Sequence, residues 1–461
     1  MGTRFLHRAF VTFALAAAMA CNRGPQVDNS RHAAAIQRIV ASTPAWVDRD
    51  RLGTKLWKAE RDFYASRRNL PAWLDGDKAS PRLAALIGAL KHSEDHGLDP
   101  ARYHTDGFQQ AVAGAAQNRE RYELAKIPEL DARLTYAYLR YAADLLGWSG
   151  NPKAIYETWL VAPNKVDLAD HLEQAVSADT VRASLDELAP GHSQYKGLQT
   201  ALQRERMNPT GHLDQIRMNL ERWRWMPRDL GDRYIFVNVP AYQMQLMEGN
   251  TPALAMRVIV GDPKHPTPLF NDEMTTVVFS PNWNVPESIV RKEMVPKLVD
   301  DPGFLERQDI QVVGTSGQAV DAEAVDWNDE AVVAGLHFRQ EPGPKNALGL
   351  VKLLFPNQFD VYMHDTPTDS LFNKQRRALS HGCIRLENPA ALAQYVLRDK
   401  PEWTPEKIDA AMNAGREQGV PLKDHIPVHI AYFTAWVNAD GSVSYTDDPY
   451  HLDEKQKVQR V

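Results

Sequence analysis

The spacing of apolar residues changes midway along the chain, and this change limits the protein to a helical part followed by a β-rich part. Up to about residue 207, apolar residues recur every three to four positions, which is the period of a helix with one buried face. Beyond that point they come in short β-branched and aromatic runs separated by turn residues, as strands do. The pattern predicts an α+β chain, with a helical domain over 31–207, a mainly β domain over 208–450 and a C-terminal tail over 451–461.

Two helices of the first part stand out. Residues 81–91 carry leucines at helical spacing, and the run 97–100 (Gly-Leu-Asp-Pro) interrupts the pattern. A second helix is expected to end at Gly147. Its apolar stripe, predicted to be core rather than a ligand site, consists of Leu130, Leu134, Tyr138, Tyr141 and Leu145.

The second part contains several candidate strands and two well-marked helix starts. Asn388-Pro389 and Thr404-Pro405 each combine a capping residue with a proline at the first helical position, where the missing N–H costs nothing. A short helix is expected over 218–225. The expected strands are 234–239, 243–247, 256–260, 275–279 and 359–363, with a hairpin of 428–437 and 442–445.

Residues 286–339 interrupt the β pattern for longer than an ordinary loop. The segment mixes a helical stretch, a polar stretch and a short apolar patch. It is expected either to form a lid over a cleft or to be a decorated surface loop, and we favour the lid.

The chain begins with the features of an export signal. A basic start precedes an uncharged apolar run that is shorter than the roughly 20 residues a membrane span needs. The run ends on Ala18-Met19-Ala20, a small-x-small cleavage pattern, so 1–20 is predicted to be a signal peptide and 21–30 a tether. Cys21 then resembles the lipid-bearing cysteine of bacterial lipoproteins, although Ala18 stands where leucine is usual. Plain secretion and an uncleaved anchor are the alternatives.

Charge argues against one large class of partner. The formal net charge is −6, from 53 basic and 59 acidic residues that are interspersed along the chain. A nucleic-acid-binding surface needs a concentrated basic patch, and none is visible in the sequence. Nucleic acid is therefore not expected as a partner.

Cys383 is the only cysteine beyond the N-terminal segment. A thiol without a disulfide partner in an exported protein indicates a reactive cysteine. The alternative is a buried, inert cysteine that packs as a small apolar residue. His364 lies nineteen positions upstream (383 − 364 = 19) on an expected strand and is the predicted base that removes the thiol proton. Either the backbone carbonyl of Asp365 or another acceptor is expected to orient its ring.

The residues around the cysteine are the predicted supporting groups. If the segment is extended, His381 and Cys383 share a face. The N–H groups of Gly382 and Cys383 are expected to form an oxyanion hole, with Ser380 in a supporting position. Arg385 is expected either to bind a substrate carboxylate or to hold the loop through an ion pair.

A zinc site is the competing interpretation of the same residues. His364, His381 and Cys383 are possible zinc ligands, but no paired-cysteine or His-x-x-x-His spacing supports them, and His425 and His429 fall in another strand. The sequence therefore predicts neither a metal nor an organic cofactor.

His364 together with Ser380-His381-Gly382-Cys383-Ile384-Arg385 closely resembles the active-site signature of bacterial L,D-transpeptidases, the cell-wall enzymes with a cysteine nucleophile. The likeness indicates the long branch of that family, in which a helical scaffold precedes the catalytic domain. The further matching segments are 237–241, 282–286, 340–349 and 364–367 in the catalytic part, and 72–73, 97–100 and 130–135 in the scaffold.

The resemblance implies a reaction and further site residues. Cys383 would attack the carbonyl of the third residue of a peptidoglycan stem and release D-Ala, and a side-chain amine of another stem would take the acyl group to form a 3–3 cross-link. His364 would be the base, and 286–339 the capping subdomain. Tyr362, Trp283 and Asn346, besides Arg385, are candidate substrate contacts.

The resemblance also implies peptidoglycan stems as partners and a periplasmic location. The chain departs from longer members in one respect, because 198–218 leaves no room for a peptidoglycan-binding module between scaffold and catalytic domain. Hydrolysis of the same substrate (an L,D-carboxypeptidase), a papain-like protease and a non-catalytic wall-binding scaffold are the rival functions.

Overall fold

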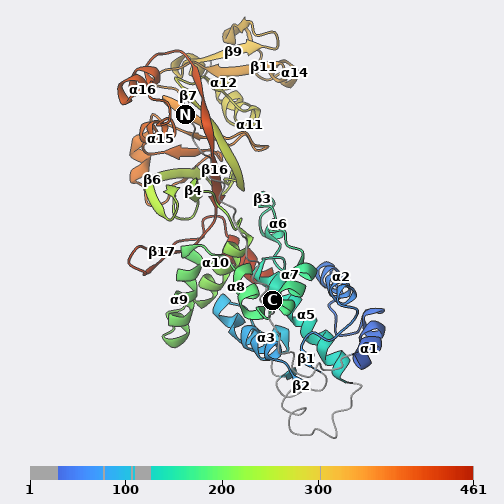
Figure 1. Cartoon of the computed structure of the whole chain (residues 1–461). Helices are drawn as coiled ribbons and strands as arrows, with labels where there is room; N and C mark the ends of the chain where they lie inside the picture. The colour runs from blue at the N-terminus through green and yellow to red at the C-terminus, as the bar shows by residue number, and fades with distance from the viewer. Residues whose placement is uncertain (1–29, 76–77, 105–106, 109–125, 302, 460–461) are drawn as a thin grey trace, which may run out of the picture.

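The computed structural model describes residues 30–75, 78–104, 107–108, 126–301 and 303–459. A helical half is followed along the chain by a mainly β half, which confirms the predicted fold class (Figure 1). The signal segment and Cys21 lie outside the described residues. No helix within the described ranges is long and apolar enough to cross a membrane.

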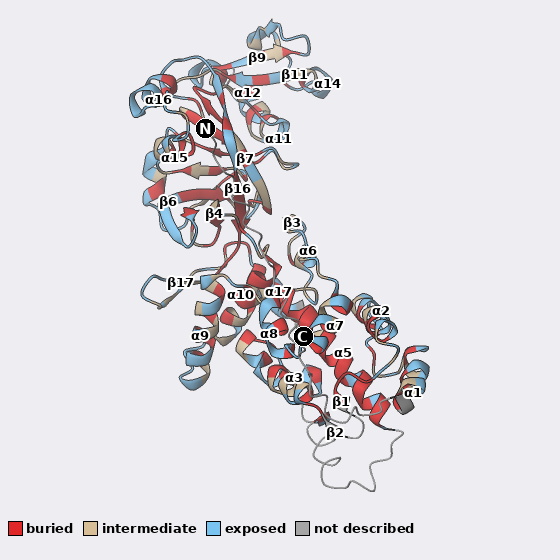
Figure 2. Ribbon diagram, viewed as in Figure 1, coloured by how far each residue is buried: buried red, intermediate tan, exposed pale blue. Residues whose placement is uncertain are grey.

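The helical half is built around α5 (Ile127–Leu145). Figure 2 shows this helix as largely buried and surrounded by the other helices of that half. The predicted stripe is buried, but so is most of the rest of the helix, because neighbouring helices cover it on several sides. Gly147, at φ 76°, ends α5 as predicted. The other elements are α1 (Ser30–Val40), α2 (Arg51–Ser66), β1 (Leu74–Asp75), β2 (Lys78–Ala79), α3 (Pro81–Lys91), η1 (His92–His96), η2 (Pro100–Tyr103), α6 (Pro152–Ile155), α7 (Leu168–Ser177), α8 (Val181–Leu188) and α9 (Ser193–Met207).

The β half is organised by one large sheet that closes on itself. The strand order is β12-β13-β15-β6-β5-β4-β16-β7-β3, and β12 also pairs with β7. The closed sheet surrounds a core of apolar side chains from its inner face. Its strands are β3 (Trp159–Leu160), β4 (Arg233–Asn238), β5 (Gln243–Glu248), β6 (Thr251–Gly261), β7 (Leu269–Phe279), β12 (Val351–Leu354), β13 (Met363–His364), β14 (Ala378–Ser380, which pairs with β6), β15 (Ile384–Leu386) and β16 (Gln418–Ala431).

Local signals predicted several elements of this half correctly. Asn388 and Thr404 cap α15 (Pro389–Val396) and α16 (Pro405–Met412) through their side chains. The strands expected over 234–239, 243–247, 256–260 and 275–279 exist, and β6 and β7 are longer than predicted.

Two strand predictions were wrong in extent. The expected strand over 359–363 is reduced to β13, because the chain turns at Asp360, where φ is 53°. The first arm of the expected hairpin is divided, since residues up to Ala431 belong to β16 and pair with β4. The hairpin itself consists of β17 (Ala435–Val437) and β18 (Val443–Tyr445).

The predicted insertion forms a small unit with a core of its own. In Figure 1 it lies at one end of the molecule, beyond the closed sheet. Its four-stranded sheet has the order β10-β9-β11-β8. Its elements are β8 (Trp283–Asn284), α11 (Glu287–Ile289), the π-helix η3 (Val290–Met294), α12 (Val295–Asp300), α13 (Phe304–Arg307), β9 (Ile310–Gly314), β10 (Ala319–Val320), η4 (Ala322–Ala324), α14 (Glu330–Ala334) and β11 (Leu336–Gln340).

The two halves are joined by packing as well as by the chain. β3 comes from the helical half but pairs with β7 of the large sheet. α9 and α10 (Leu213–Trp225) pack on each other and share a core with β4 and the β17–β18 hairpin. The end of the chain, expected as a tail, forms α17 (Leu452–Gln459) instead. Leu452 is fully buried there, and Gln456 accepts a hydrogen bond from Arg222.

Candidate active site around Cys383

Cys383 and His364 are brought to neighbouring strands of the closed sheet. β13 pairs with β15 in parallel, with Met363 opposite Ile384 and His364 opposite Arg385. Met363 and Ile384 both point into the core. Because side chains alternate along a strand, His364 and Arg385 point to the outer face. Cys383, two residues before Arg385, belongs to the same face, so the predicted nucleophile and base share one surface.

The ring of His364 is held in one orientation. Its side chain is buried, and Nδ1 donates to the backbone carbonyl of Asp365 at 2.5 Å. A carbonyl only accepts, so Nδ1 carries the proton and Nε2 has the lone pair a base requires. Of the two acceptors considered for the ring, the structure uses the Asp365 carbonyl. The Asp365 carboxylate turns away and accepts from the Leu350 N–H at 2.8 Å.

The surroundings favour the neutral forms of both groups. Burial raises the pKa of the Cys383 thiol to about 11, although a backbone hydrogen bond from Tyr362 and the charge of Arg385 oppose the rise. Burial, followed by the charge of Arg385, lowers the pKa of His364 to about 3. At neutral pH the thiol and the imidazole are therefore both neutral at rest, and the thiol is directed at the Asp360 carbonyl, 3.9 Å from the sulfur.

A tight turn separates His381 from the cysteine. Gly382 has φ 114°, a conformation that other residues rarely adopt. Ser380 is buried and stabilises this turn, since its hydroxyl donates to the Cys383 carbonyl at 2.5 Å and accepts from the Gly382 N–H at 3.2 Å. The predicted oxyanion hole is therefore wrong in one donor. The Gly382 N–H already has a partner, which leaves the Cys383 N–H as the donor of this segment.

Two residues that the sequence did not single out hold the turn from behind. The hydroxyl of Thr267 donates to the Gly382 carbonyl at 2.9 Å and accepts from the Gly261 N–H at 2.8 Å. Tyr450 donates to the Gly261 carbonyl at 2.7 Å and accepts from the Thr267 N–H at 3.1 Å. Three of these four contacts join positions more than 100 residues apart, and no local pattern marks them.

His381 points toward the insertion. The segment is not extended, so the argument that placed His381 on the face of Cys383 does not apply. Its Nε2 lies 2.5 Å from a carboxylate oxygen of Glu293, which belongs to η3. Its ring also lies near His265, with 4.7 Å between centroids. Glu293 carried no signal in the sequence, because it is one acidic residue among 59.

Arg385 and Tyr362 lie at the site as predicted. The Tyr362 ring centroid is 5.7 Å from that of His364. Burial lowers the pKa of Arg385, opposed by the neighbouring Cys383. Its Nε is buried without a hydrogen-bond partner, and no carboxylate of the described residues pairs with it. The loop-holding ion pair considered for Arg385 is therefore not formed within the described chain.

Trp283 and Asn346 do not lie at the cysteine. Trp283 is in β8 and packs against the core of the insertion. Asn346 is buried and donates to the backbone carbonyls of Pro281 and Glu341, while its carbonyl accepts from the Leu348 N–H. With both ends of its amide occupied, Asn346 organises the loop between β11 and β12, so its polar groups are not available as the predicted substrate contact in this conformation.

Of the three residues considered for zinc, His381 is directed away from His364 and Cys383. His381 is directed at Glu293, and both ring nitrogens of His429 have other partners, the Asn271 side chain and the Leu230 carbonyl. Across the described ranges, no three or more histidine, cysteine or acidic side chains are grouped so that they could hold a metal ion.

Comparison with known proteins agrees with the two-part organisation. Residues 58–202 match the scaffold domain family, and residues 232–415 match the L,D-transpeptidase catalytic domain family. A protein of Haemophilus influenzae named "Putative L,D-transpeptidase" is 28% identical over 412 residues, which cover 87% of this chain and 79% of that protein.

Solved structures give a weaker likeness. An L,D-transpeptidase from Mycobacterium smegmatis is 14% identical, with a TM-score of 0.20, over 43% of this chain and 58% of that one. L,D-transpeptidase 1 of Mycobacterium tuberculosis is 12% identical, with a TM-score of 0.17, over 43% of this chain and 61% of that one. The matched region spans less than two thirds of either solved chain. On these matches, the chain contains an L,D-transpeptidase catalytic domain over residues 232–415, with a scaffold domain over residues 58–202 ahead of it.

Proposed function

We propose that this protein is a peptidoglycan L,D-transpeptidase that forms 3–3 cross-links through a thioester on Cys383. The Cys383 sulfur attacks the carbonyl carbon of the third residue of a tetrapeptide stem while His364 Nε2 takes the thiol proton. The amide bond to the fourth residue breaks, and His364 returns that proton to the leaving D-Ala amine. A side-chain amine of a second stem then attacks the thioester, the new amide forms, and Cys383 regains its proton.

One observation carries this proposal. Cys383 and His364 occupy the same outer face of paired strands, and the Asp365 carbonyl holds the His364 ring through Nδ1. This is the arrangement a nucleophile–base pair requires, with a backbone carbonyl in the orienting role that a carboxylate has in other triads. The Arg385 guanidinium beside both residues supplies positive charge for the thiolate and for an anionic stem peptide.

The experiment is intact-mass measurement of the chain after incubation with a defined tetrapeptide stem. The unchanged protein is expected to gain the mass of a tripeptide acyl group, Cys383→Ala is expected to gain none, and His364→Ala is expected to acylate roughly 10²-fold more slowly. An adduct on Cys383→Ala, or an unchanged rate in His364→Ala, contradicts the assignment of these two residues.

Water is the alternative acceptor, and with it the same acyl-enzyme gives an L,D-carboxypeptidase. Glu293 of the insertion contacts His381 next to the cysteine, which favours a covered site and an amine acceptor. Product analysis with a disaccharide tetrapeptide distinguishes the two. Dimers indicate transpeptidation, and trimmed monomers alone indicate hydrolysis.

We also propose that the protein is exported to the periplasm and that Cys21 carries a lipid anchor. The support is the N-terminal sequence, with its apolar run and small-x-small pattern directly before Cys21. Membrane fractionation of the unchanged protein and of Cys21→Ser tests this proposal. The serine variant is expected in the soluble fraction, and an unchanged membrane fraction contradicts lipidation at Cys21.

A further inference from the structure

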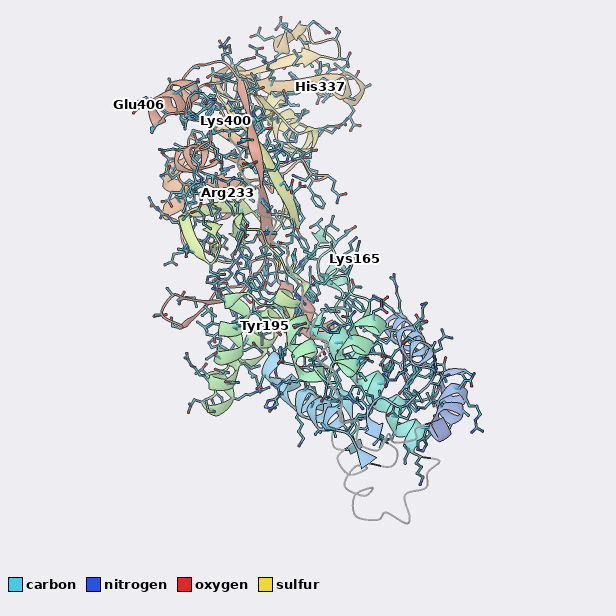
Figure 3. All side chains as sticks on the ribbon, viewed as in Figure 1. Lys165, Tyr195, Arg233, His337, Lys400 and Glu406 are labelled. Atoms are coloured by element: carbon cyan, nitrogen blue, oxygen red, sulfur yellow. The ribbon has the colours of Figure 1, made fainter. Side chains whose placement is uncertain are left out.

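A groove of about 450 Å³ lies on the outer face of the closed sheet, away from Cys383. It runs between β4 and β5 on one side and the start of α9 and the β17–β18 hairpin on the other. In Figure 3 the labelled Arg233 and Tyr195 mark β4 and α9. The lining residues are His192, Ser193, Gln194, Tyr234, Phe236, Gln243, Gln245, Met247, Asn250, Pro252, Trp436, Val437, Asn438 and Ala439.

The lining of this groove carries no ionised side chain. Acidic and basic residues make up 24% of the chain, so about three would be expected among fourteen lining residues (0.24 × 14 ≈ 3), and there is none. Burial lowers the pKa of His192 to about 4, so its ring is neutral at neutral pH. Five of the lining residues are instead asparagine or glutamine. Such a groove suits a ligand that is polar and uncharged.

An aromatic cluster forms one wall. Phe236 is buried, and the partly exposed Trp436 ring lies against it, with 5.5 Å between centroids. The neighbouring Val437 exchanges two backbone hydrogen bonds with the amide of Gln194, at 2.7 and 2.8 Å. The ring contact and the hydrogen bonds of the next residue hold the backbone at 436–437 against α9 and β4 before any ligand binds, which lowers the entropy cost of binding.

Two amides are free to bind a ligand. Gln243 and Gln245 are two residues apart on β5 and therefore lie on one face, and Gln245 is opposite Phe236 in the register. Neither side chain has a hydrogen-bond partner within the described chain, whereas the amides of Gln194 and Asn438 are both used internally. An amide offers two donors and an acceptor, which match hydroxyl and acetamido groups.

The groove and the cysteine lie on the same side of the sheet. Met244 and Leu246 of β5 point into the core together with Ile384, so Gln243, Gln245 and Cys383 all face outward. The strand order β15-β6-β5 separates them by two strand spacings, which is about 10 Å across the strands. The loop that carries η5 (Asp369–Asn373) contacts β6 between them.

We propose that this groove binds a neutral saccharide chain bearing acetamido groups, namely the glycan strand from which the stem peptides hang. The inference rests on the proposed function, because that function makes the cell-wall polymer the substrate. The aromatic wall packs on the apolar faces of the sugar rings, and Gln243 and Gln245 bind their polar groups. The chain thereby holds the wall on its catalytic domain without a separate binding module.

The proposal is tested by isothermal titration calorimetry, in which the full chain is titrated with the tetramer of N-acetylglucosamine and saccharide binding is measured. Saturable binding is expected, weakened about threefold to tenfold by Gln245→Ala and by Gln243→Ala, since each loses one or two hydrogen bonds. The exposed Gln418→Ala on β16 is the matched control and is expected to bind normally. Both groove residues are at the surface, so their variants are expected to fold. To test the aromatic wall, Trp436→Phe is preferred to Trp436→Ala, because phenylalanine keeps an aromatic ring against Phe236 and alanine would disturb the aromatic cluster.

Absence of saturable binding in the millimolar range overturns the inference, and so does binding that Gln243→Ala and Gln245→Ala leave unchanged. Acylation of Cys383 by a sugar-free tetrapeptide, measured on the same variants, keeps the two proposals apart. Groove variants are expected to acylate normally and to lose only saccharide binding. If the unchanged protein is not acylated, the proposed function is contradicted. Whether the groove binds a saccharide is still decided by the calorimetric titration.

Discussion

Single residues decide the protonation state from which the reaction starts. The pKa of Cys383 is raised to about 11 and that of His364 is lowered to about 3, chiefly by burial in both cases. The pair is neutral between these values, unlike a preformed thiolate–imidazolium pair. In the proposed reaction the thiolate is therefore generated during attack, and the neighbouring Arg385 charge reduces the free-energy cost of ionising the thiol.

The pH dependence of Cys383 alkylation by iodoacetamide is the first prediction. Because only the thiolate reacts, the rate is expected to rise about tenfold per pH unit from pH 6 to 9 without a plateau. Arg385→Gln removes the cation that lowers the thiol pKa, so its profile is expected to move to higher pH. Mass spectrometry of the peptide containing Cys383 gives the rate. A flat profile across neutral pH would show a preformed ion pair and contradict the neutral resting state.

The insertion meets the catalytic motif through a contact between two elements. η3 is a short π-helix, a geometry that often marks functional positions, and it presents Glu293 to His381. Both side chains are 38% exposed, so solvent screens the pair. Exposed ion pairs contribute at most about 1 kcal/mol, which limits the effect on a rate to about fivefold.

Glu293→Ala is therefore expected to lower kcat/KM for acylation by about threefold to fivefold and to increase hydrogen exchange in 287–300. Its control is Glu287→Ala, which removes the pair with Arg291 on the same insertion but does not touch the motif. If both variants lose the same activity and protection, the effect belongs to the stability of the insertion and not to the contact with His381.

At the scale of the whole molecule, each half has a main core of its own besides the one they share, and the helical core contains a buried acidic pair. Glu60 and Asp131 are fully buried. Asp131 accepts from the Ala72 and Trp73 N–H groups and from the Tyr64 hydroxyl, whereas neither Glu60 oxygen has a hydrogen-bond partner among the described residues. Burial, followed by the charge of Asp131, raises the pKa of Glu60 well above its usual value.

The raised pKa makes stability depend on pH. In the unfolded chain Glu60 loses its proton near 4.5, while the folded chain retains it. The free energy of unfolding therefore falls as pH rises above 4.5, by up to roughly 1.4 kcal/mol per pH unit until the folded pKa is reached. Glu60→Gln stays neutral at every pH and is expected to melt at a higher temperature than the unchanged protein at pH 8, but not at pH 4.5. The exposed Glu129→Gln on α5 is the control. Equal melting of Glu60→Gln and the unchanged protein at pH 8 would show that Glu60 is not destabilising there.

Short-range patterns in the sequence determined the division into a helical and a β half, the caps at Asn388 and Thr404 and the end of α5 at Gly147. Each of these depends on side-chain period, on backbone dihedral preference or on a motif of a few residues, so neighbouring residues are sufficient to indicate it.

Only the tertiary structure decided which groups are free and which are occupied. It showed the Gly382 N–H taken by Ser380, His381 directed at Glu293 across 88 positions of the chain, Asn346 enclosed in its loop, and β3 added to the sheet of the other half. These outcomes depend on packing between segments far apart in the sequence. A residue's own neighbours do not encode which distant donor or acceptor will reach it.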